Sequence, residues 1–231
     1  MKLRFEHKYL IEYETYLQIR DRLGKVLNLD SNSIGGKGYH LRSLYFDDIY
    51  DSALMEKSAG ISTRKKYRIR IYNHSDEVIK LEIKRKFQDY TNKISTTITK
   101  DDYNKIYTGD IADFPSRQNE VMTNYYLQMR NNLLKPKVIV DYYREAYILP
   151  YNQIRITLDN NLSAASPQYN IFTDDVFSRQ LDVKYSRILE VKYNNFLPDF
   201  VKKVFEPFPM TRLSVSKYVL CREELINMGG N

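Results

Sequence analysis

Residues 66–86 read KYRIRIYNHSDEVIKLEIKRK, and charged side chains alternate with apolar ones on both sides of its centre. Arg68 and Arg70 alternate with isoleucines before the central NHSDE segment, and Glu82 and Lys84 alternate with Leu and Ile after it. Successive side chains of a β-strand point to opposite faces. The stretch therefore predicts a β-hairpin with one charged face and one apolar face, joined through a polar loop.

Three further stretches repeat the same pattern: FEHKYLI at 5–11, IRITLD at 154–159 and ILEVKY at 188–193. One such strand is ordinary, but a recurrence over most of the chain indicates a shared polar surface. The economical arrangement is an antiparallel barrel, closed or nearly closed, with a charged interior, an apolar exterior and flanking helices, in the α+β class. Together with Arg68, Arg70, Glu82 and Lys84, the charged side chains expected in the interior are Glu6, Lys8, Lys86, Arg144, Arg155, Asp159, Glu190 and Lys192.

The size and charge of the chain limit the number of domains and the class of ligand to be expected. The chain has 231 residues, of which 42% are hydrophobic, so we expect one domain over 1–231. A net charge of +7 favours a polyanionic ligand. The sequence shows neither a signal peptide nor an apolar run of membrane-spanning length. We therefore expect a cytoplasmic protein that reaches a membrane only through a partner protein.

The charged faces suggest phosphate chemistry. Burying so many cations without anions costs several kcal/mol for each, so a barrel of this kind requires a polyanion inside it. Arginine forks match phosphate oxygens, and carboxylates such as Glu82 and Glu190 suit Mg²⁺ or Mn²⁺. The three histidines lack the spacing of a zinc site. Taken singly, however, each motif is more typical of a solvated strand face than of a binding site, and only the recurrence in five strands favours the site.

Helical patterns flank the strands. Spacing predicts helices over 14–27, with Thr15 as a cap, and after Thr99 or Asp101. Further expected elements are a loop over 31–40, a strand over 41–48, a helical region over 117–134, a long strand over 137–149, a short helix over 198–205 and a last strand over 211–220.

The ordered set of motifs resembles the VTC domain, the polyphosphate polymerase branch of the triphosphate tunnel metalloenzyme superfamily. The resemblance runs from FEHKYLI through SLYFDD, KYRIRIY, LEIKRK, VIVDYYREAY, IRITLDNNL and ILEVKYN to SVSKYVL. It implies an eight-stranded antiparallel tunnel. The implied activity is transfer of the γ-phosphoryl group of ATP to a growing polyphosphate chain, with Mn²⁺ or Mg²⁺.

The resemblance also implies roles for individual residues. Lys8, Arg68, Arg70, Lys84 and Arg155 would bind phosphate, and Glu190 would hold the metal. Ser216 and Lys217 would close the phosphate site from the last strand. Glu6, Glu82, Lys86 and Lys192 lie on the same strand faces and are assigned supporting roles, with Glu82 a second candidate metal ligand. Arg144, from the set of charged residues expected in the interior, is a further candidate for substrate binding.

The last strand departs from the family pattern at one position. Ser214 stands where a lysine is expected, and Arg212, two residues earlier on the same face, is the candidate substitute. Simple alternation points Lys217 to the opposite face from Ser216, so a bulge or the strand end must redirect it.

Three other functions remain open. A triphosphate hydrolase would use water as the acceptor, and a non-catalytic protein would bind polyphosphate or nucleotide without turnover. A nucleic-acid module would bind DNA or RNA in a salt-sensitive way. The chain lacks the interleaving of aromatic and basic residues that single-strand binding favours, so no nucleic-acid partner is expected.

Overall fold

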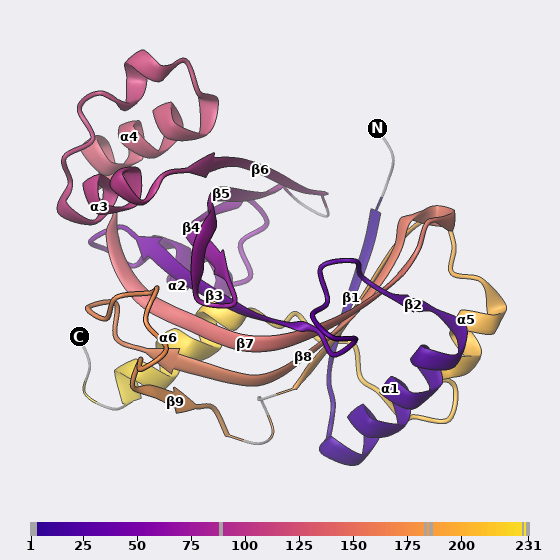
Figure 1. Ribbon diagram of the computed structural model, residues 1–231. Coiled ribbons are helices and arrows are strands. Elements are labelled where there is room, and N and C mark those ends of the chain that lie inside the picture. Colours follow the sequence, from indigo (N-terminus) through magenta and orange to yellow (C-terminus); the bar gives the residue numbers. More distant parts are fainter. Residues whose placement is uncertain (1–3, 88–89, 183, 185–186, 228, 230–231) are drawn as a thin grey trace. The chain divides into compact units, whose positions relative to one another are not determined.

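The computed structural model describes residues 4–87, 90–182, 184, 187–227 and 229. The helices and strands are shown in Figure 1. The strands are β1 (Arg4–Leu10), β2 (Asn28–Leu29), β3 (Tyr39–Asp47), β4 (Arg64–Tyr72), β5 (Ser75–Phe87), β6 (Tyr90–Ile98), β7 (Lys135–Leu149), β8 (Ile154–Ala165), β9 (Ser178–Gln180) and β10 (Ile188–Asn194). The α-helices are α1 (Tyr13–Val26), α2 (Ser52–Ser58), α3 (Lys100–Thr108), α4 (Glu120–Asn132), α5 (Asp199–Phe205) and α6 (Lys217–Asn227), with 3₁₀ turns at Phe114–Arg117 and Tyr151–Gln153.

The sheet path runs through eight strands in the order β1-β10-β8-β7-β3-β4-β5-β6, with β2 and β9 paired beside it. Strands β1 and β10, β10 and β8, β3 and β4, β4 and β5, and β5 and β6 pair antiparallel. The expected α+β class, with an eight-stranded antiparallel sheet and flanking helices, is confirmed.

The chain forms two compact units. The first unit contains residues 1–40, 142–163 and 180–217. The second unit contains residues 41–141, 164–179 and 218–231. Each unit has its own hydrophobic core, and each is described separately below.

In the first unit, helices α1 and α5 cover the apolar face of strands β8 and β10. Ile19 and Leu23 of α1 are fully buried in the same cluster as Ile156 of β8, Val191 of β10 and Val201 of α5. These strand residues alternate with the charged ones in sequence, so the period of two separates the two faces as expected.

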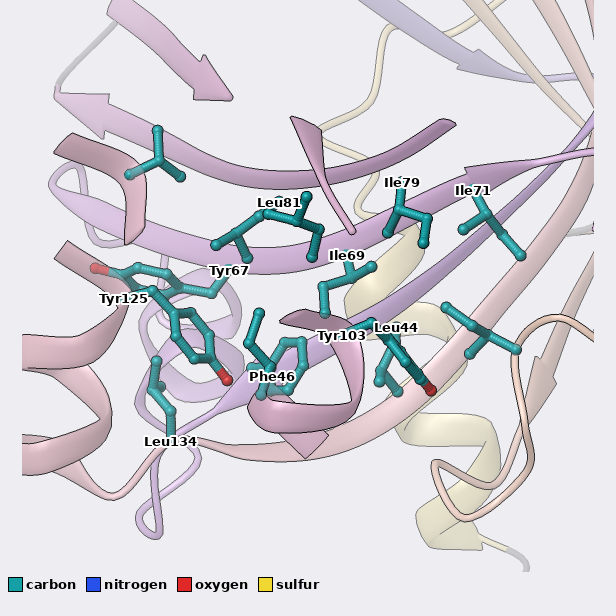
Figure 2. Close-up of a cluster of buried hydrophobic side chains, with 14 of the residues drawn as sticks. Leu44, Phe46, Tyr67, Ile69, Ile71, Ile79, Leu81, Tyr103, Tyr125 and Leu134 are labelled. Carbon is teal, nitrogen blue, oxygen red and sulfur yellow. The ribbon is translucent and has the colours of Figure 1, made fainter. Parts of the chain in front are cut away.

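In the second unit, helices α3 and α4 cover the apolar face of strands β4 and β5. Figure 2 shows Ile69 and Leu81 from the two strands in one cluster with Tyr125 of α4. Thr99 caps α3: its hydroxyl accepts a hydrogen bond from Asp102 N at 3.0 Å, and the Asp102 carboxylate accepts one from Thr99 N at 3.0 Å. This capping box confirms the predicted start of the helix.

Three local features differ from what the sequence pattern predicts. Helix α1 begins at Tyr13 after Glu12, not at a Thr15 cap. Asp47 accepts hydrogen bonds from the amides of Ala53 and Leu54 and so fixes helix α2, which was not predicted.

The third difference concerns the expected last strand over 211–220. Arg212 makes only an isolated bridge to Tyr9, and α6 begins at Lys217. Tyr218, Cys221 and Arg222 of this helix are buried at helical spacing, so tertiary packing overrides the β-like alternation that precedes them.

The loop before β3 is tied closely to β7. The Lys37 amide donates to the Ile34 carbonyl at 3.1 Å, which closes a turn. Gly38 follows with φ +110°, and a Cβ at this position would lie 2.3 Å from the carbonyl oxygen of Arg144. Lys37 and Gly38 thus form a turn, and glycine is the residue that permits the close approach.

Within the part of the chain that the structure describes, no helix has the length and apolar character needed to cross a membrane.

Candidate functional site: two charged strand faces

The charged face of the second unit is strongly cationic. Strand register places Arg68 directly opposite Glu82, and Lys84 between Lys66 and Lys93. Eight basic side chains occupy this set of facing positions on β4, β5 and β6: Arg64, Lys66, Arg68, Arg70, Lys80, Lys84, Lys86 and Lys93. Among the described residues at these positions, the acid is Glu82.

Glu82 is buried, with 2% of its surface exposed, and it lies among cations. Arg68 Nε lies 2.6 Å from Oε2, Lys93 Nζ lies 2.7 Å from Oε1, and Arg70 lies 3.8 Å from Oε2. Burial opposes ionisation of this carboxyl, but the attraction of Arg68, Arg70 and Lys93 outweighs it and holds the pKa of Glu82 well below its usual range.

Side chains of β3 support the two arginines. The Arg68 guanidinium donates to the Tyr45 hydroxyl at 2.8 Å, and its Cζ lies 5.6 Å from the centre of that ring. Arg70 Nε donates to Ser43 Oγ at 3.2 Å. Both guanidinium groups are therefore held in fixed orientations before any ligand binds.

The charged face of the first unit has a different composition, because lysines and carboxylates alternate across it. Lys8 of β1 lies opposite Glu190 of β10, and Glu6 lies opposite Lys192. Lys8 Nζ is 2.9 Å from Glu6 Oε1 and 3.5 Å from Glu190 Oε1. Lys192 Nζ is 3.0 Å from Glu190 Oε2 and 3.8 Å from Glu6 Oε2.

Two carboxylates thus share two ammonium groups. Burial opposes ionisation of Glu190, but Lys192, Lys8 and Lys217 hold its pKa well below its usual range. Burial lowers the pKa of Lys192, an effect that Glu190 and Glu6 oppose. Carboxylate oxygens are the ligands that Mg²⁺ and Mn²⁺ prefer. Glu6 and Glu190 fit a divalent ion, because the two carboxylates lie close enough to contact the same ammonium groups.

Asp159 organises the neighbouring part of this face. It is 1% exposed and accepts two hydrogen bonds from Arg144, at 2.6 and 2.7 Å. Lys217 Nζ lies 2.6 Å from Oδ2, which also accepts the 2.7 Å hydrogen bond from Arg144, and both cations lie over the ring of Tyr142. Burial opposes ionisation of Asp159, but Arg144 and Lys217 lower its pKa.

Arg155 lies beside this group on β8, where its partner across the ladder is Lys192. Its guanidinium pairs with the buried Asp30 at 2.5 Å and donates to the Tyr39 hydroxyl at 3.0 Å. The first unit therefore sets five cations (Lys8, Arg144, Arg155, Lys192 and Lys217) against four carboxylates (Glu6, Asp30, Asp159 and Glu190).

The structure separates the expected site residues into these two groups. Glu6, Lys8, Arg144, Arg155, Glu190, Lys192 and Lys217 lie in the first unit, and Arg68, Arg70, Glu82, Lys84 and Lys86 lie in the second. Ser216 is half-buried, whereas Arg212 is exposed and its backbone bridges Tyr9.

Sequence reasoning missed Lys93, Asp30 and the role of Asp159. Lys93 begins the alternating segment KISTTI, so the period of two could have placed it on the charged face. Asp159 was placed on the correct strand face but was given no partner. No local pattern links Asp30 to Arg155, because 124 intervening residues separate them.

Comparison with known proteins decides the family. The sequence profile of the VTC domain matches residues 3–226, nearly the whole chain. The chain belongs to the VTC domain family. A search among curated proteins found no match.

Solved structures with a similar fold are distant in sequence from this VTC domain. The PH1819 protein of Pyrococcus horikoshii OT3 is 14% identical with a TM-score of 0.51, over 96% of this chain and 99% of that one. A "putative adenylate cyclase" of Bacillus halodurans is 15% identical with a TM-score of 0.50, over 100% of this chain and 91% of that one. These likenesses concern the fold alone.

Proposed function

We propose that this VTC domain is a metal-dependent polyphosphate polymerase, which transfers the γ-phosphoryl group of ATP to the end of a polyphosphate chain. The observation that carries the proposal is the imbalance on the charged face of the second unit. Eight basic side chains face one buried acid there, and a polyanion is the ligand that compensates such a surface.

The two faces support different tasks. The lysines and arginines of β4, β5 and β6 suit a chain of phosphates, since arginine forks bind oxygens in pairs and lysines add point charges. Glu190, with Glu6 beside it, would hold Mn²⁺ or Mg²⁺, which supplies charge neutralisation on the phosphate oxygens when bound. Lys8, Arg144, Arg155 and Lys217 would bind phosphate oxygens on the first unit.

The reaction places few demands on acid–base groups. The terminal phosphate oxygen of the acceptor chain is already ionised, so it attacks without a general base. Arg68 and Arg70, held by Ser43, Tyr45 and Glu82, would orient the phosphates so that nucleophile and leaving group lie in line. Fixed donors of this kind stabilise developing charge without reorganisation during the reaction.

Incubation of the purified protein with ATP and Mn²⁺, followed by sizing of the products on a gel, tests the proposal. Polyphosphate that lengthens with time, together with ADP, is expected. Orthophosphate without chains would instead identify a triphosphate hydrolase. Binding of ATP without turnover under Mn²⁺, Mg²⁺ and other divalent ions would leave a non-catalytic binding protein.

A further inference from the structure

We infer that Glu82 is a positioning residue for the phosphate-binding cations of the second unit, and that it acts through Arg68 and Lys93 rather than as a ligand of the divalent ion. This inference rests on the proposed function. It gives Glu82 a different role from Glu190, although the sequence pattern alone treats both as isolated acids on cationic strands.

The Glu82 carboxylate joins cations from two different strands. The two oxygens of Glu82 are used separately: Oε2 accepts from Arg68 Nε at 2.6 Å, and Oε1 accepts from Lys93 Nζ at 2.7 Å. Arg68 is on β4 and Lys93 is on β6, on either side of β5. One carboxylate therefore fixes the spacing between cations that belong to strands on opposite sides of its own.

The surroundings of Glu82 do not favour a divalent ion. The Glu82 side chain is 2% exposed, whereas that of Lys93 is 48% exposed. A divalent ion at Glu82 would have to displace Arg68 and Lys93 from a buried carboxylate, with Arg70 a further 3.8 Å contact. Glu190 is paired with lysines as well, but Glu6 lies beside it as a second carboxylate that shares the same two ammonium groups. The ion-pair partners of Glu82 among the described residues are Arg68, Arg70 and Lys93.

The pairing with Glu82 also orients Arg68 for a ligand. Glu82 uses one edge of the Arg68 guanidinium through Nε, while Tyr45 accepts from Nη1. An oriented guanidinium presents its remaining donors in a fixed direction, so less freedom is lost when a phosphate binds. Removing the Glu82 charge keeps anions attracted to the face but leaves the cations free to reorient.

Kinetics of Glu82→Gln test this role, because the amide keeps the size of the side chain and removes its charge. We expect kcat to fall about 100-fold, the cost of a misplacement near 1 Å, while KM for ATP changes less than about threefold. Binding of Mn²⁺ to the nucleotide-free protein, followed by electron paramagnetic resonance, should be unchanged. Glu190→Gln, the matched variant, should lose the bound Mn²⁺.

Two readouts do not depend on turnover, so they separate this inference from the polymerase proposal. The Arg68 Nε–H resonance of the wild-type protein should exchange slowly with solvent, and Glu82→Gln should abolish that protection. Because the variant gains net positive charge but loses geometry, sulfate should bind more tightly and triphosphate equally well. The selectivity for triphosphate over sulfate should therefore fall about tenfold, or 1.4 kcal/mol.

Glu82→Asp provides the control if the amide variant does not fold. It keeps the charge but is one methylene too short to reach Arg68 and Lys93 together, so kcat should be intermediate and selectivity partly retained. Loss of Mn²⁺ binding in Glu82→Gln would make Glu82 a metal ligand and overturn the inference. Unchanged kcat and unchanged selectivity would overturn it as well.

Discussion

Lys217 Nζ lies 2.6 Å from Asp159 Oδ2, so the first residue of helix α6 is anchored to a buried carboxylate of strand β8. Strand alternation placed Lys217 on the wrong face and required a bulge to redirect it. The structure needs no bulge, because the direction of this side chain is set by the start of a helix and by its partner.

Asp159→Asn should lower the free energy of unfolding by about 3–5 kcal/mol, the usual cost of breaking a buried ion pair from one side. The change leaves Arg144 and Lys217 without their shared counter-ion in a buried position. Urea unfolding followed by circular dichroism measures the loss.

The matched control is Asp21→Asn, which breaks the exposed pair between Asp21 and Lys25 on α1. Exposed pairs of this spacing contribute about 0.5 kcal/mol or less. Equal losses for the two variants would show that Asp159 is not a buried counter-ion.

Glu190→Gln should abolish turnover but retain binding of polyphosphate. The amide removes the charge that a divalent ion needs, while the cations on both strand faces remain. Product sizing with Mg²⁺ and with Mn²⁺, together with calorimetric titration of polyphosphate, checks both parts. Near-wild-type activity with either metal would contradict the assignment of Glu190.

The affinity for triphosphate should fall when any one of three arginines is changed to Lys, and should fall further when it is changed to Ala. The three are Arg68, Arg70 and Arg155. Lysine keeps the charge but loses the two-pronged donor geometry. Calorimetric titration gives the affinities, and a double-mutant cycle between Arg68 and Arg155 shows whether the two contact the same ligand. Additive losses would indicate separate ligands.

Arg130, exposed in the last turn of α4, is the control for these substitutions. Arg20 on α1 is less suitable, because its guanidinium lies 5.6 Å from the centre of the Tyr16 ring. Arg130→Ala should leave affinity and turnover unchanged, and a loss as large as that of Arg68→Ala would point to a general effect of net charge.

Triphosphate should raise the melting temperature, because basic side chains outnumber acidic ones among the described residues of the charged face of the second unit. At one hundred times the dissociation constant, the added stability is about 2.7 kcal/mol. Differential scanning fluorimetry measures the shift against sulfate at equal ionic strength, which should do much less. Equal shifts for the two anions would argue against a specific polyanion site.

Stability should fall on acidification, with the loss confined to low pH. The pKa values of Glu82 and Glu190 lie below the ordinary value of 4.5, so the unfolded chain takes up protons before the folded protein does. These groups therefore contribute their full stability above about pH 4.5, and that contribution declines as the pH falls further.

Melting temperatures between pH 7 and pH 3 test this, and the decline should persist in 0.5 M NaCl because buried pairs are weakly screened. Glu82→Gln should weaken the dependence of stability on acid pH, whereas Glu77→Gln, at the exposed start of β5, should not. An acid limb that is the same in all three proteins would contradict the role of Glu82.

Much of the fold was predictable because strand alternation is a local property. The pattern in KYRIRIY and LEIKRK placed Ile69 and Leu81 in the core, and the Thr99 box placed the start of α3. The charged residues of β1, β4, β5, β8 and β10 were assigned to the correct face for the same reason, whereas Lys217, which begins a helix, was not.

What the sequence could not supply is the pairing of charges across long intervals. Asp30 neutralises Arg155, and Asp159 joins Arg144 to Lys217, through contacts that no short motif encodes. Sequence alone therefore leads to an overestimate of the net positive charge on the strand face of the first unit. Helix α6 was missed because the burial of Tyr218 and Arg222 depends on tertiary contacts.

Gly38 approaches the Arg144 carbonyl so closely that any side chain would displace the loop or the strand beneath it. A deep mutational scan scored on activity should therefore rank position 38 with the phosphate-binding residues, although the glycine has no group that could hold an anion. Mutational intolerance at position 38 would reflect the close contact with the backbone of Arg144. A list of catalytic residues drawn up from mutational sensitivity alone would therefore include Gly38 wrongly.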